Sequence, residues 1–291
     1  TTYGVTDNTY HVILVTNTDQ GYQYNLSGMV DGSWSLGTYD VNAGLSYTNS
    51  QSKDINSLTS SQARSNWKYN PVGMHTNEPN LTSSNYEVPH RIVGSLGATF
   101  NFVESSSTTF SFFYEGQSGR PFSYKGEEGD IDYNGDGDAR NDLIFVFNDA
   151  SKVNMVDSEG NNAWDAWTAF VNQDDALKEY KGKIIDRNAG RQPWRNRLDL
   201  RITQKVFDRV ELTFDILNFA NLLSSDAGKQ EYVRYGTVDL LEFTGFADEN
   251  DVSSKPTFEF DTEKYTKTED VYSVDDFGSR WQMLLGLRIN I

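Results

Sequence analysis

The stretch RLDLRITQKVFDRVELTFDI, residues 197–216, reads as two strands joined by a short turn. Apolar residues occupy alternate positions on both arms, and most positions between them are polar or charged. The apolar set is Leu198, Leu200, Ile202, Val206, Val210, Leu212, Phe214 and Ile216. Because successive side chains of a strand point to opposite faces, this alternation predicts a hairpin that turns at residues 207–209 and has one apolar and one polar face.

The polar face of this hairpin carries full charges that fall opposite one another. With the turn at residues 207–209, Lys205 faces Glu211 and Arg201 faces Asp215. Opposite charges directly across a strand pair stabilise the pairing. We therefore expect the charges of this face to neutralise one another across strands.

The same alternation recurs in other segments, each about ten residues long. Their first residues are Tyr22, Tyr39, Ile92, Phe110 and Trp281, and a further run lies near His11 to Thr16. Short turns are expected at residues 31–37 and 104–107. Together with the two arms of the hairpin above, the sequence predicts roughly eight antiparallel strands.

The connections between these strands alternate in length. Short turns follow one strand and long polar segments follow the next. The long segments are residues 49–89, 118–194 and 220–279. Short periplasmic turns that alternate with long extracellular loops are typical of outer-membrane barrels. The sequence thus predicts an all-β fold, an antiparallel transmembrane β-barrel segment. The half-exposed antiparallel sheet of a soluble protein is an alternative that amphipathic strands leave open.

Composition agrees with an all-β chain and argues against several classes of function. The 291 residues include 16 Tyr, 17 Phe and 23 Gly but only 6 Pro, which favours many strands joined by glycine turns. A formal net charge of −17 argues against a nucleic-acid partner, because phosphates would be repelled. The absence of cysteine from this sequence excludes disulfides and thiolate metal ligands within it.

The membrane interpretation assigns the apolar positions to lipid. Leu200, Phe214 and Leu285 are expected to face lipid at mid-depth, and Thr203 is expected to face a wet lumen. A strand of about ten residues with alternate apolar side chains can cross a bilayer, so the lack of a long apolar run does not argue against this assignment.

Six motifs lie in order along the chain. They are SSQARSNWKYNP (60–71), VPHRIVGSL (88–96), FYEGQSGRPFSY (113–124), DYNGDGDARNDLIFV (132–146), RNAGRQPWRNRLDLRITQ (187–204) and DILNFANLL (215–223). In content, order and spacing they resemble the closing third of TonB-dependent outer-membrane receptors of the Oar-like type. The resemblance extends over most of the chain.

This resemblance implies a barrel of about 22 strands with a plug domain, preceded by a carboxypeptidase-regulatory-like domain, in the outer membrane of a Gram-negative cell. The plug and the earlier strands are not within residues 1–291, so the chain is expected to be the C-terminal part of the barrel. The implied partners are outer-membrane lipid, TonB through the missing N-terminal region, and a bulky ligand that is imported or exported. Such barrels usually end in an aromatic residue, whereas this sequence departs from that pattern by ending at Ile291.

An acidic stretch in the second long segment has the ligand spacing of a calcium loop. The candidate metal ligands are Asp132, Asn134, Asp136, Asp138 and Asp142. Oxygen ligands at alternate positions, with Gly137 after the third, allow a tight loop to surround a hard cation. The full EF-hand pattern is not met, because the twelfth position is Leu143. A solvated acidic turn, rich in Asn, Asp and Gly, is the alternative interpretation.

Apolar residues at helical spacing follow in the same long segment. They are Trp164, Trp167, Phe170 and Leu177, with Asn161 and Asn162 before them as possible caps. This pattern predicts a short helix packed on the structure of the loop itself, in preference to an aromatic platform for substrate.

The sequence indicates no enzyme. The three histidines, His11, His75 and His90, lie far apart along the chain and do not make a zinc set. No nucleophile elbow, HExxH motif or phosphate loop accompanies the serines and aspartates. No other cofactor is expected.

Three interpretations of function remain after these observations. A receptor or transporter for a bulky ligand is favoured by the family resemblance. The alternative is an outer-membrane structural or interaction protein whose acidic extracellular loops bind a partner protein or a surface glycan. A complete eight-stranded barrel can also close on its own side chains, but Gly44, Ser46, Gly97 and Gly286 on the inward face leave too little volume to fill it.

Overall fold

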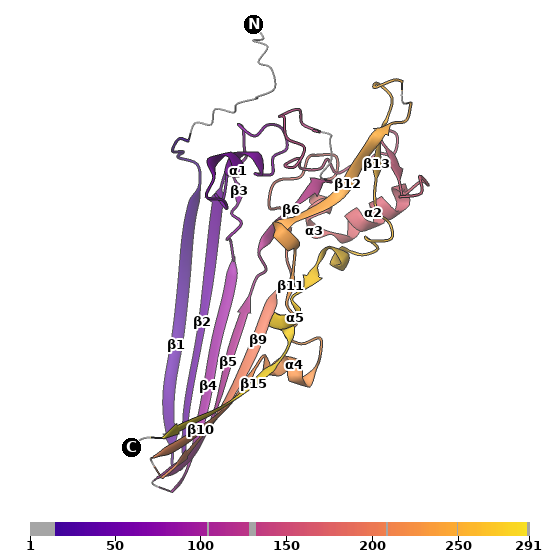
Figure 1. The fold of residues 1–291 in the computed structure, drawn as a ribbon. Helices are drawn as coiled ribbons and strands as arrows, with labels where there is room; N and C mark the ends of the chain where they lie inside the picture. The colour runs from indigo at the N-terminus through magenta and orange to yellow at the C-terminus, as the bar shows by residue number, and fades with distance from the viewer. Residues whose placement is uncertain (1–14, 104, 128–131, 208, 249, 290–291) are drawn as a thin grey trace.

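The computed structural model describes residues 15–103, 105–127, 132–207, 209–248 and 250–289 (Figure 1). It is mostly antiparallel β-sheet with a few short helices, which confirms the all-β prediction. None of the helices in these ranges is long and apolar enough to cross a membrane. Figure 1 shows a tall sheet with most of the long connections gathered at one end.

Seven long strands form a single antiparallel meander within the described residues, which we call the main sheet. In spatial order they are β1 (Tyr22–Leu36), β2 (Tyr39–Asp54), β4 (His90–Val103), β5 (Ser106–Gln117), β9 (Arg195–Val206), β10 (Val210–Leu217) and β15 (Gln282–Ile289). The short β3 (Thr82–Ser83) pairs with the end of β2. This sheet is open, with β1 and β15 at its two edges.

The strand predicted near His11 to Thr16 lies mostly outside the described residues. Residues 11–14 lie outside the described residues, and Val15 and Thr16 are not in a strand.

The predicted register of the β9–β10 hairpin is confirmed. Lys205 lies opposite Glu211, and Arg201 lies opposite Asp215. Arg201 Nη2 donates to Asp215 Oδ2 at 3.0 Å, so this pair neutralises itself across the strands as expected. Glu211 forms its ion pair on its other side, with Arg288 of β15 at 3.7 Å.

The turn between β1 and β2 is shorter than predicted. The prediction of a turn at residues 31–37 is wrong, because β1 continues to Leu36 and β2 begins at Tyr39. The alternation of apolar and polar residues along β1 does not stop at Val30, since Trp34 lies on the same apolar face, opposite Val41 of β2. Gly37 has a φ of +72°, a conformation that two-residue hairpin turns require. In the same way, β5 begins at Ser106, inside the turn predicted at residues 104–107.

The apolar face of the main sheet is largely uncovered. The exposed fractions are 71% for Leu26, 81% for Leu285 and 63% for Leu287. Leu200 differs from the prediction, because it lies on this face but is only 9% exposed. The short helix α4 (Phe219–Leu223) packs against β9, and its Phe219 ring lies 6.5 Å from that of Phe112, the residue opposite Leu200.

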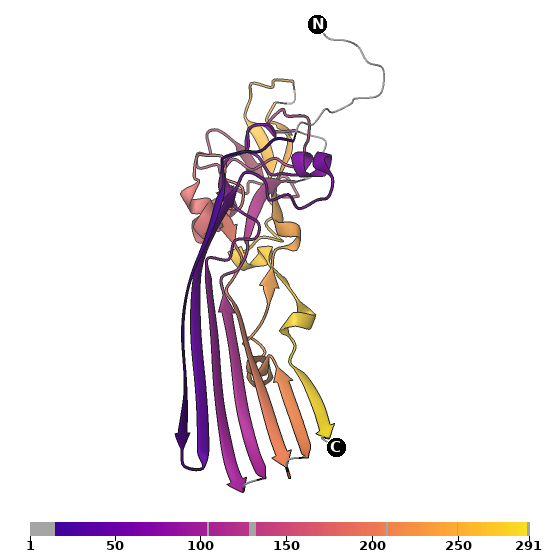
Figure 2. The ribbon, with the colours of Figure 1, turned by 90° about the vertical axis from the view of Figure 1, so that its left-hand side faces the viewer.

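The long connections fold together instead of standing as separate polar loops. We call the described residues of 55–89, 118–192 and 233–272 the cap; it lies beyond one end of the main sheet, and the short turns lie at the other end (Figure 2). In the described residues its five-stranded sheet has the order β7 (Asn154–Val156), β13 (Pro256–Glu259), β12 (Thr237–Phe246), β6 (Pro121–Gly126) and β8 (Gly190–Arg191).

Short helices and bridges complete the connections. They are α1 (Ala63–Lys68), α2 (Trp164–Gln173), α3 (Asp175–Glu179), η1 (Arg234–Gly236), η2 (Thr268–Val271), α5 (Asp276–Ser279) and the pair β11 (Glu231–Tyr232) with β14 (Ser273–Val274).

The cap has a hydrophobic core of its own, and the predicted helix packs into it. Trp167 and Phe170 of α2 are fully buried, which confirms a helix packed on the structure of the loop. Leu177 is also fully buried, but α2 ends at Gln173 and Leu177 lies in the separate helix α3. Trp167 Nε1 donates to the Phe147 carbonyl at 2.9 Å, and its ring meets the ring of Phe260. The helix begins one residue later than the predicted caps allow, although Asn162 Oδ1 accepts from the Trp164 N–H at 3.0 Å.

Candidate functional site

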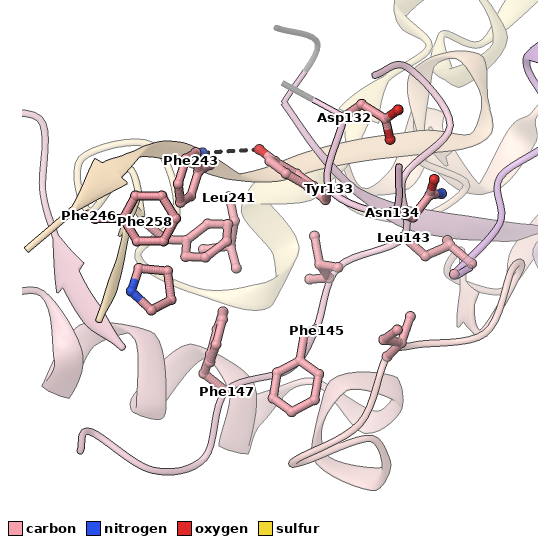
Figure 3. A pocket seen from close by; sticks show the side chains of 14 residues that line it. Asp132, Tyr133, Asn134, Leu143, Phe145, Phe147, Leu241, Phe243, Phe246 and Phe258 are labelled. Carbon is pink, nitrogen blue, oxygen red and sulfur yellow. Dashed lines mark hydrogen bonds between the residues drawn. The ribbon is translucent and has the colours of Figure 1, made fainter. Parts of the chain in front are cut away.

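The cap contains a pocket of about 530 Å³ that is lined mainly by aromatic side chains (Figure 3). We call it the aromatic pocket. Its lining residues are Gly73, Asp132, Tyr133, Asn134, Leu143, Ile144, Phe145, Phe147, Ile184, Leu241, Phe243, Phe246, Pro256 and Phe258. A volume of this size and an apolar wall with a few polar groups are typical of sites for small molecules or for one group of a larger ligand.

The rings of the aromatic pocket are held by contacts with one another. Phe258 of β13 lies 5.3 Å from Phe243 and 5.2 Å from Phe147, measured between ring centroids. Phe147 in turn lies 5.0 Å from Phe145. Tilted and edge-to-face contacts at these separations are the favoured arrangements of aromatic rings. The aromatic wall of the pocket is therefore already formed without a ligand.

An irregularity in β12 brings two of these rings to the same pocket. Phe243 and Phe246 are three positions apart, so a regular strand would place them on opposite faces. The pairing of β12 with β13 shifts register between Phe243 and Gly245, and Gly245 has a φ of +134°. A bulge of this kind redirects the following side chain. As a result, the two rings lie 5.3 Å apart.

Tyr133 joins the aromatic pocket to the acidic loop of residues 132–142. Its hydroxyl oxygen accepts from the Phe243 N–H at 3.0 Å (Figure 3). Its ring lies so close to Gly126 that a Cβ there would be 2.0 Å from Tyr133 Cε2. Burial raises the pKa of the Tyr133 hydroxyl, which therefore stays neutral and polar at the edge of the pocket.

The acidic loop carries all five residues predicted as calcium ligands. Asp132 accepts from the N–H groups of Gly135 and Gly137, both at 2.6 Å. Asn134 Oδ1 accepts from the Asp136 N–H at 2.9 Å. Gly137 has a φ of +96°, so it supplies the tight turn that was expected of it.

The other three predicted ligands have partners of different kinds. Asp136 Oδ2 accepts from the Thr76 N–H at 3.1 Å. The Asp138 carboxylate pairs with Lys68 at 2.9 Å and with Arg140 at 3.0 Å.

Asp142 is the most buried member of the set. Asp142 is 2% exposed, and its Oδ2 atom accepts a hydrogen bond from the Tyr133 N–H at 2.9 Å. Burial, followed by repulsion from the nearby Asp132, Asp136 and Asp138 carboxylates, raises its pKa to about 6, although the Tyr133 hydrogen bond opposes this. The described residues contain no ready-made cluster of three or more acidic, histidine or cysteine side chains at metal-binding separation.

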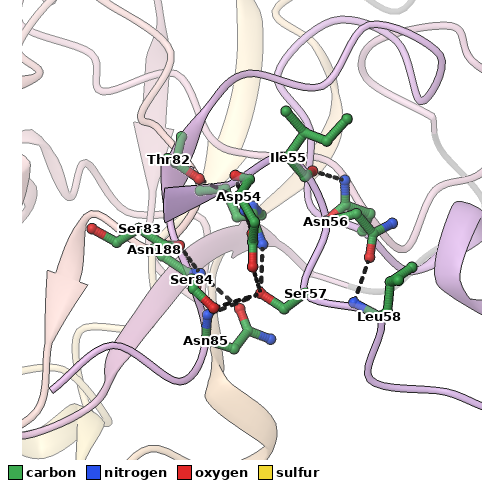
Figure 4. Close-up of polar contacts among 12 residues, drawn as sticks. Asp54, Ile55, Asn56, Ser57, Leu58, Thr82, Ser83, Ser84, Asn85 and Asn188 are labelled. Atoms are coloured by element: carbon green, nitrogen blue, oxygen red, sulfur yellow. Dashed lines mark hydrogen bonds and ion pairs between the residues drawn. The ribbon is translucent and has the colours of Figure 1, made fainter. Parts of the chain in front are cut away.

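A buried polar cluster, which we call the clasp, fixes the cap on the main sheet (Figure 4). Arg187, 5% exposed, donates to the Asp54 carbonyl at 2.7 Å, to the Asp54 carboxylate, and to Thr82 Oγ1 at 3.1 Å. Asn188 Nδ2 donates to the Ser83 carbonyl at 2.6 Å. These bonds tie the end of β2 and β3 to the segment that leads into β8, so the cap cannot move independently of the sheet without breaking them.

The histidines have separate partners. His75 Nδ1 accepts from the Asn77 N–H at 3.0 Å, and His90 Nδ1 lies 2.8 Å from the Tyr47 hydroxyl. His11 lies outside the described residues.

Sequence reasoning missed the aromatic pocket. Its rings come from residues 133–147 and 243–258, which lie in two different long connections. No local sequence pattern predicts that these two connections pack together. The alternation of Phe145 and Phe147 was the available local signal. Comparisons of the chain with models of protein families, with curated proteins and with solved structures found no match.

Proposed function

We propose that this chain is the C-terminal part of the β-barrel of a TonB-dependent receptor in the outer membrane of a Gram-negative cell, and that its cap binds a bulky ligand for transport. The observation that carries the proposal is the uncovered apolar face of the main sheet. Its most exposed side chains include Leu26, Val30, Leu36, Leu285, Leu287 and Ile289. Soluble proteins rarely leave a continuous apolar surface of this extent in water, whereas barrel strands present one to lipid.

The opposite face of the main sheet is polar, as expected of a face that lines a water-filled lumen. Thr99 and Thr109 bond across strands at 2.9 Å, and Arg91 Nε donates to Glu115 Oε1 at 2.8 Å. A soluble half-exposed sheet would bury its apolar face against a second layer and leave the polar face in water. Here α4 covers only a small part of the apolar face, which favours lipid as its partner.

Strand length also suits a membrane. In the described residues β1, β2, β4, β5 and β9 are 12 to 16 residues long. A tilted membrane strand needs about 9–11 residues, so these strands can cross a bilayer and still reach the cap.

The open edges of the main sheet fit a larger barrel. In the described residues β1 pairs only with β2, and β15 pairs only with β10. Unpaired strand edges are not tolerated in the hydrocarbon region, so a membrane location would require further strands to pair with both. The resemblance to Oar-like receptors supplies such strands and the plug that they surround.

We expect transport to depend on both this protein and TonB. Cells carrying the complete receptor should deplete at least one bulky compound from a mixed medium, and cells lacking either the receptor or TonB should not. Phe243→Ala, which removes a wall of the aromatic pocket, should slow this depletion, whereas Phe277→Ala, at a residue 78% exposed, should not. Mass spectrometry of the spent medium measures the depletion by each strain.

Depletion that persists without TonB would contradict TonB-driven transport. Capture of a surface glycan or a partner protein by TonB-deficient cells would support the interaction role instead.

A further inference from the structure

Two oxygen atoms in the acidic loop are buried and lack a partner. Asn141 is 0% exposed and Asp142 is 2% exposed, and in the described residues the Oδ1 atom of each accepts no hydrogen bond. A buried polar oxygen without a partner is costly, and a carboxylate oxygen more so. Such a position calls for a positively charged or donating group that the described residues do not supply.

The orientation of both side chains is fixed by their other atoms. Asn141 Nδ2 donates to the Lys68 carbonyl and to Asp136 Oδ2, each at 3.2 Å, so its amide cannot be flipped without losing both bonds. Asp142 Oδ2 is held by the Tyr133 N–H inside the loop. Each side chain thus contacts a residue of the acidic loop.

Among the described residues, the ion pairs of the acidic loop leave three of its carboxylates without a cationic partner. Lys68 and Arg140 both pair with Asp138. In the part of the chain that the structure describes, Asp132, Asp136 and Asp142 form no ion pair, and their contacts are with N–H donors of the backbone and of the Asn141 amide. Carboxylates within one short loop repel one another, and a divalent cation would relieve the repulsion.

We propose that the acidic loop binds one Ca²⁺ ion through Asp132, Asn134, Asp136, the main chain of Asp138, and Asp142. Positions 1, 3, 5 and 7 of a calcium loop supply ligands, the seventh through its carbonyl, with glycine at position 6. Asp132, Asn134, Asp136, Gly137 and Asp138 occupy these positions in order. The buried Asp142 takes the place of the carboxylate that the twelfth position, Leu143, lacks.

The hydrogen bonds already present are compatible with a bound cation. Each carboxylate oxygen has two lone pairs, so Asp132 and Asp136 can keep their N–H partners and still bind a metal. The side chains must draw inward, because they are not yet gathered around one point. Calcium accepts irregular sets of six to eight oxygens, whereas magnesium demands a near-ideal octahedron.

Calcium at this loop would also order the aromatic pocket. Tyr133 lies between two of the proposed ligands, and its N–H, ring and hydroxyl contact Asp142, Gly126 and Phe243 respectively. A loop held by a cation therefore fixes one side of the pocket wall. The calcium site itself does not depend on the transport role.

Calcium titration of the full-length protein in detergent tests this proposal. We expect wild type to bind one Ca²⁺ with a dissociation constant of about 10⁻⁴–10⁻³ M, as extracellular calcium modules do, and to prefer Ca²⁺ to Mg²⁺. Calcium should protect the acidic loop from proteolysis, and chelation should reverse the protection. The double variant Asp136→Asn, Asp142→Asn should lose both effects.

The matched control is the double variant Asp157→Asn, Asp251→Asn in two other acidic turns of the cap, where side chains also accept backbone N–H groups. It should bind calcium as wild type does. Absence of saturable calcium binding to wild type, or equal binding by both double variants, overturns the proposal. The titration of wild type tests the site even where a variant fails to fold.

Discussion

Replacing Leu285 by arginine is expected to destabilise the assembled protein by about 2–4 kcal/mol, the cost of a cation at the mid-depth of a barrel's lipid face. Leu285 lies opposite Phe214 on the apolar face of the main sheet and is 81% exposed. In water, a substitution at so exposed a position would change stability by less than about 0.5 kcal/mol. The size of the effect therefore reports whether lipid or water meets this face.

Leu284→Arg is the matched control, because it makes the same exchange at the adjacent residue on the opposite face. Leu284 is 51% exposed and lies opposite Asp215 on the polar face, where a new cation would stay in contact with water. Heat-modifiable migration and the yield of folded protein in the outer-membrane fraction measure both variants. Equal behaviour of the two variants would contradict the assignment of the faces.

Trp167→Ala is expected to destabilise the cap by about 3–5 kcal/mol, as removal of a large buried aromatic side chain does. Trp167 is 0% exposed, packs on Phe260 and donates to the Phe147 carbonyl. Because Phe147 also lines the aromatic pocket, the pocket should be lost with the core. The main sheet, which has its own strand pairs, should persist.

Limited proteolysis of the membrane-embedded protein measures this outcome, with rapid cleavage expected in the cap and protection of the strands. Trp164→Ala, one turn earlier in α2 at a partly exposed position, should have a much smaller effect. Cleavage of the cap at the wild-type rate in the Trp167→Ala protein would show that this core does not hold the cap together.

The main sheet could be predicted from sequence because its determinants are local. Alternation within β9 and β10, together with a turn at Phe207, is enough to set the pairing of Arg201 with Asp215. The predicted end of the first strand was wrong because Gly32 was assigned to a turn. In the structure the alternation of apolar residues continues through Trp34 to Leu36.

The cap could not be predicted in the same way, because its determinants are non-local. β12 pairs in parallel with β6, more than a hundred residues earlier, and its bulges break the period on which pattern reasoning depends. Leu200 is another example, since α4, a helix of five residues after β10, packs against its strand without any periodic signal. The acidic loop was located by its spacing, but the burial of Asp142 became apparent only in the fold.

The most direct test of the membrane assignment is the labelling of single cysteines on intact cells, which is simplified by the absence of native cysteines in these residues. Ser158→Cys lies at an exposed turn of the cap, and Thr38→Cys lies at the short turn between β1 and β2. A membrane-impermeant maleimide should label the first on intact cells, and the second only after the outer membrane is permeabilised. Labelling of both positions on intact cells, labelling of the turn alone, or recovery of the protein in a soluble fraction would contradict the account.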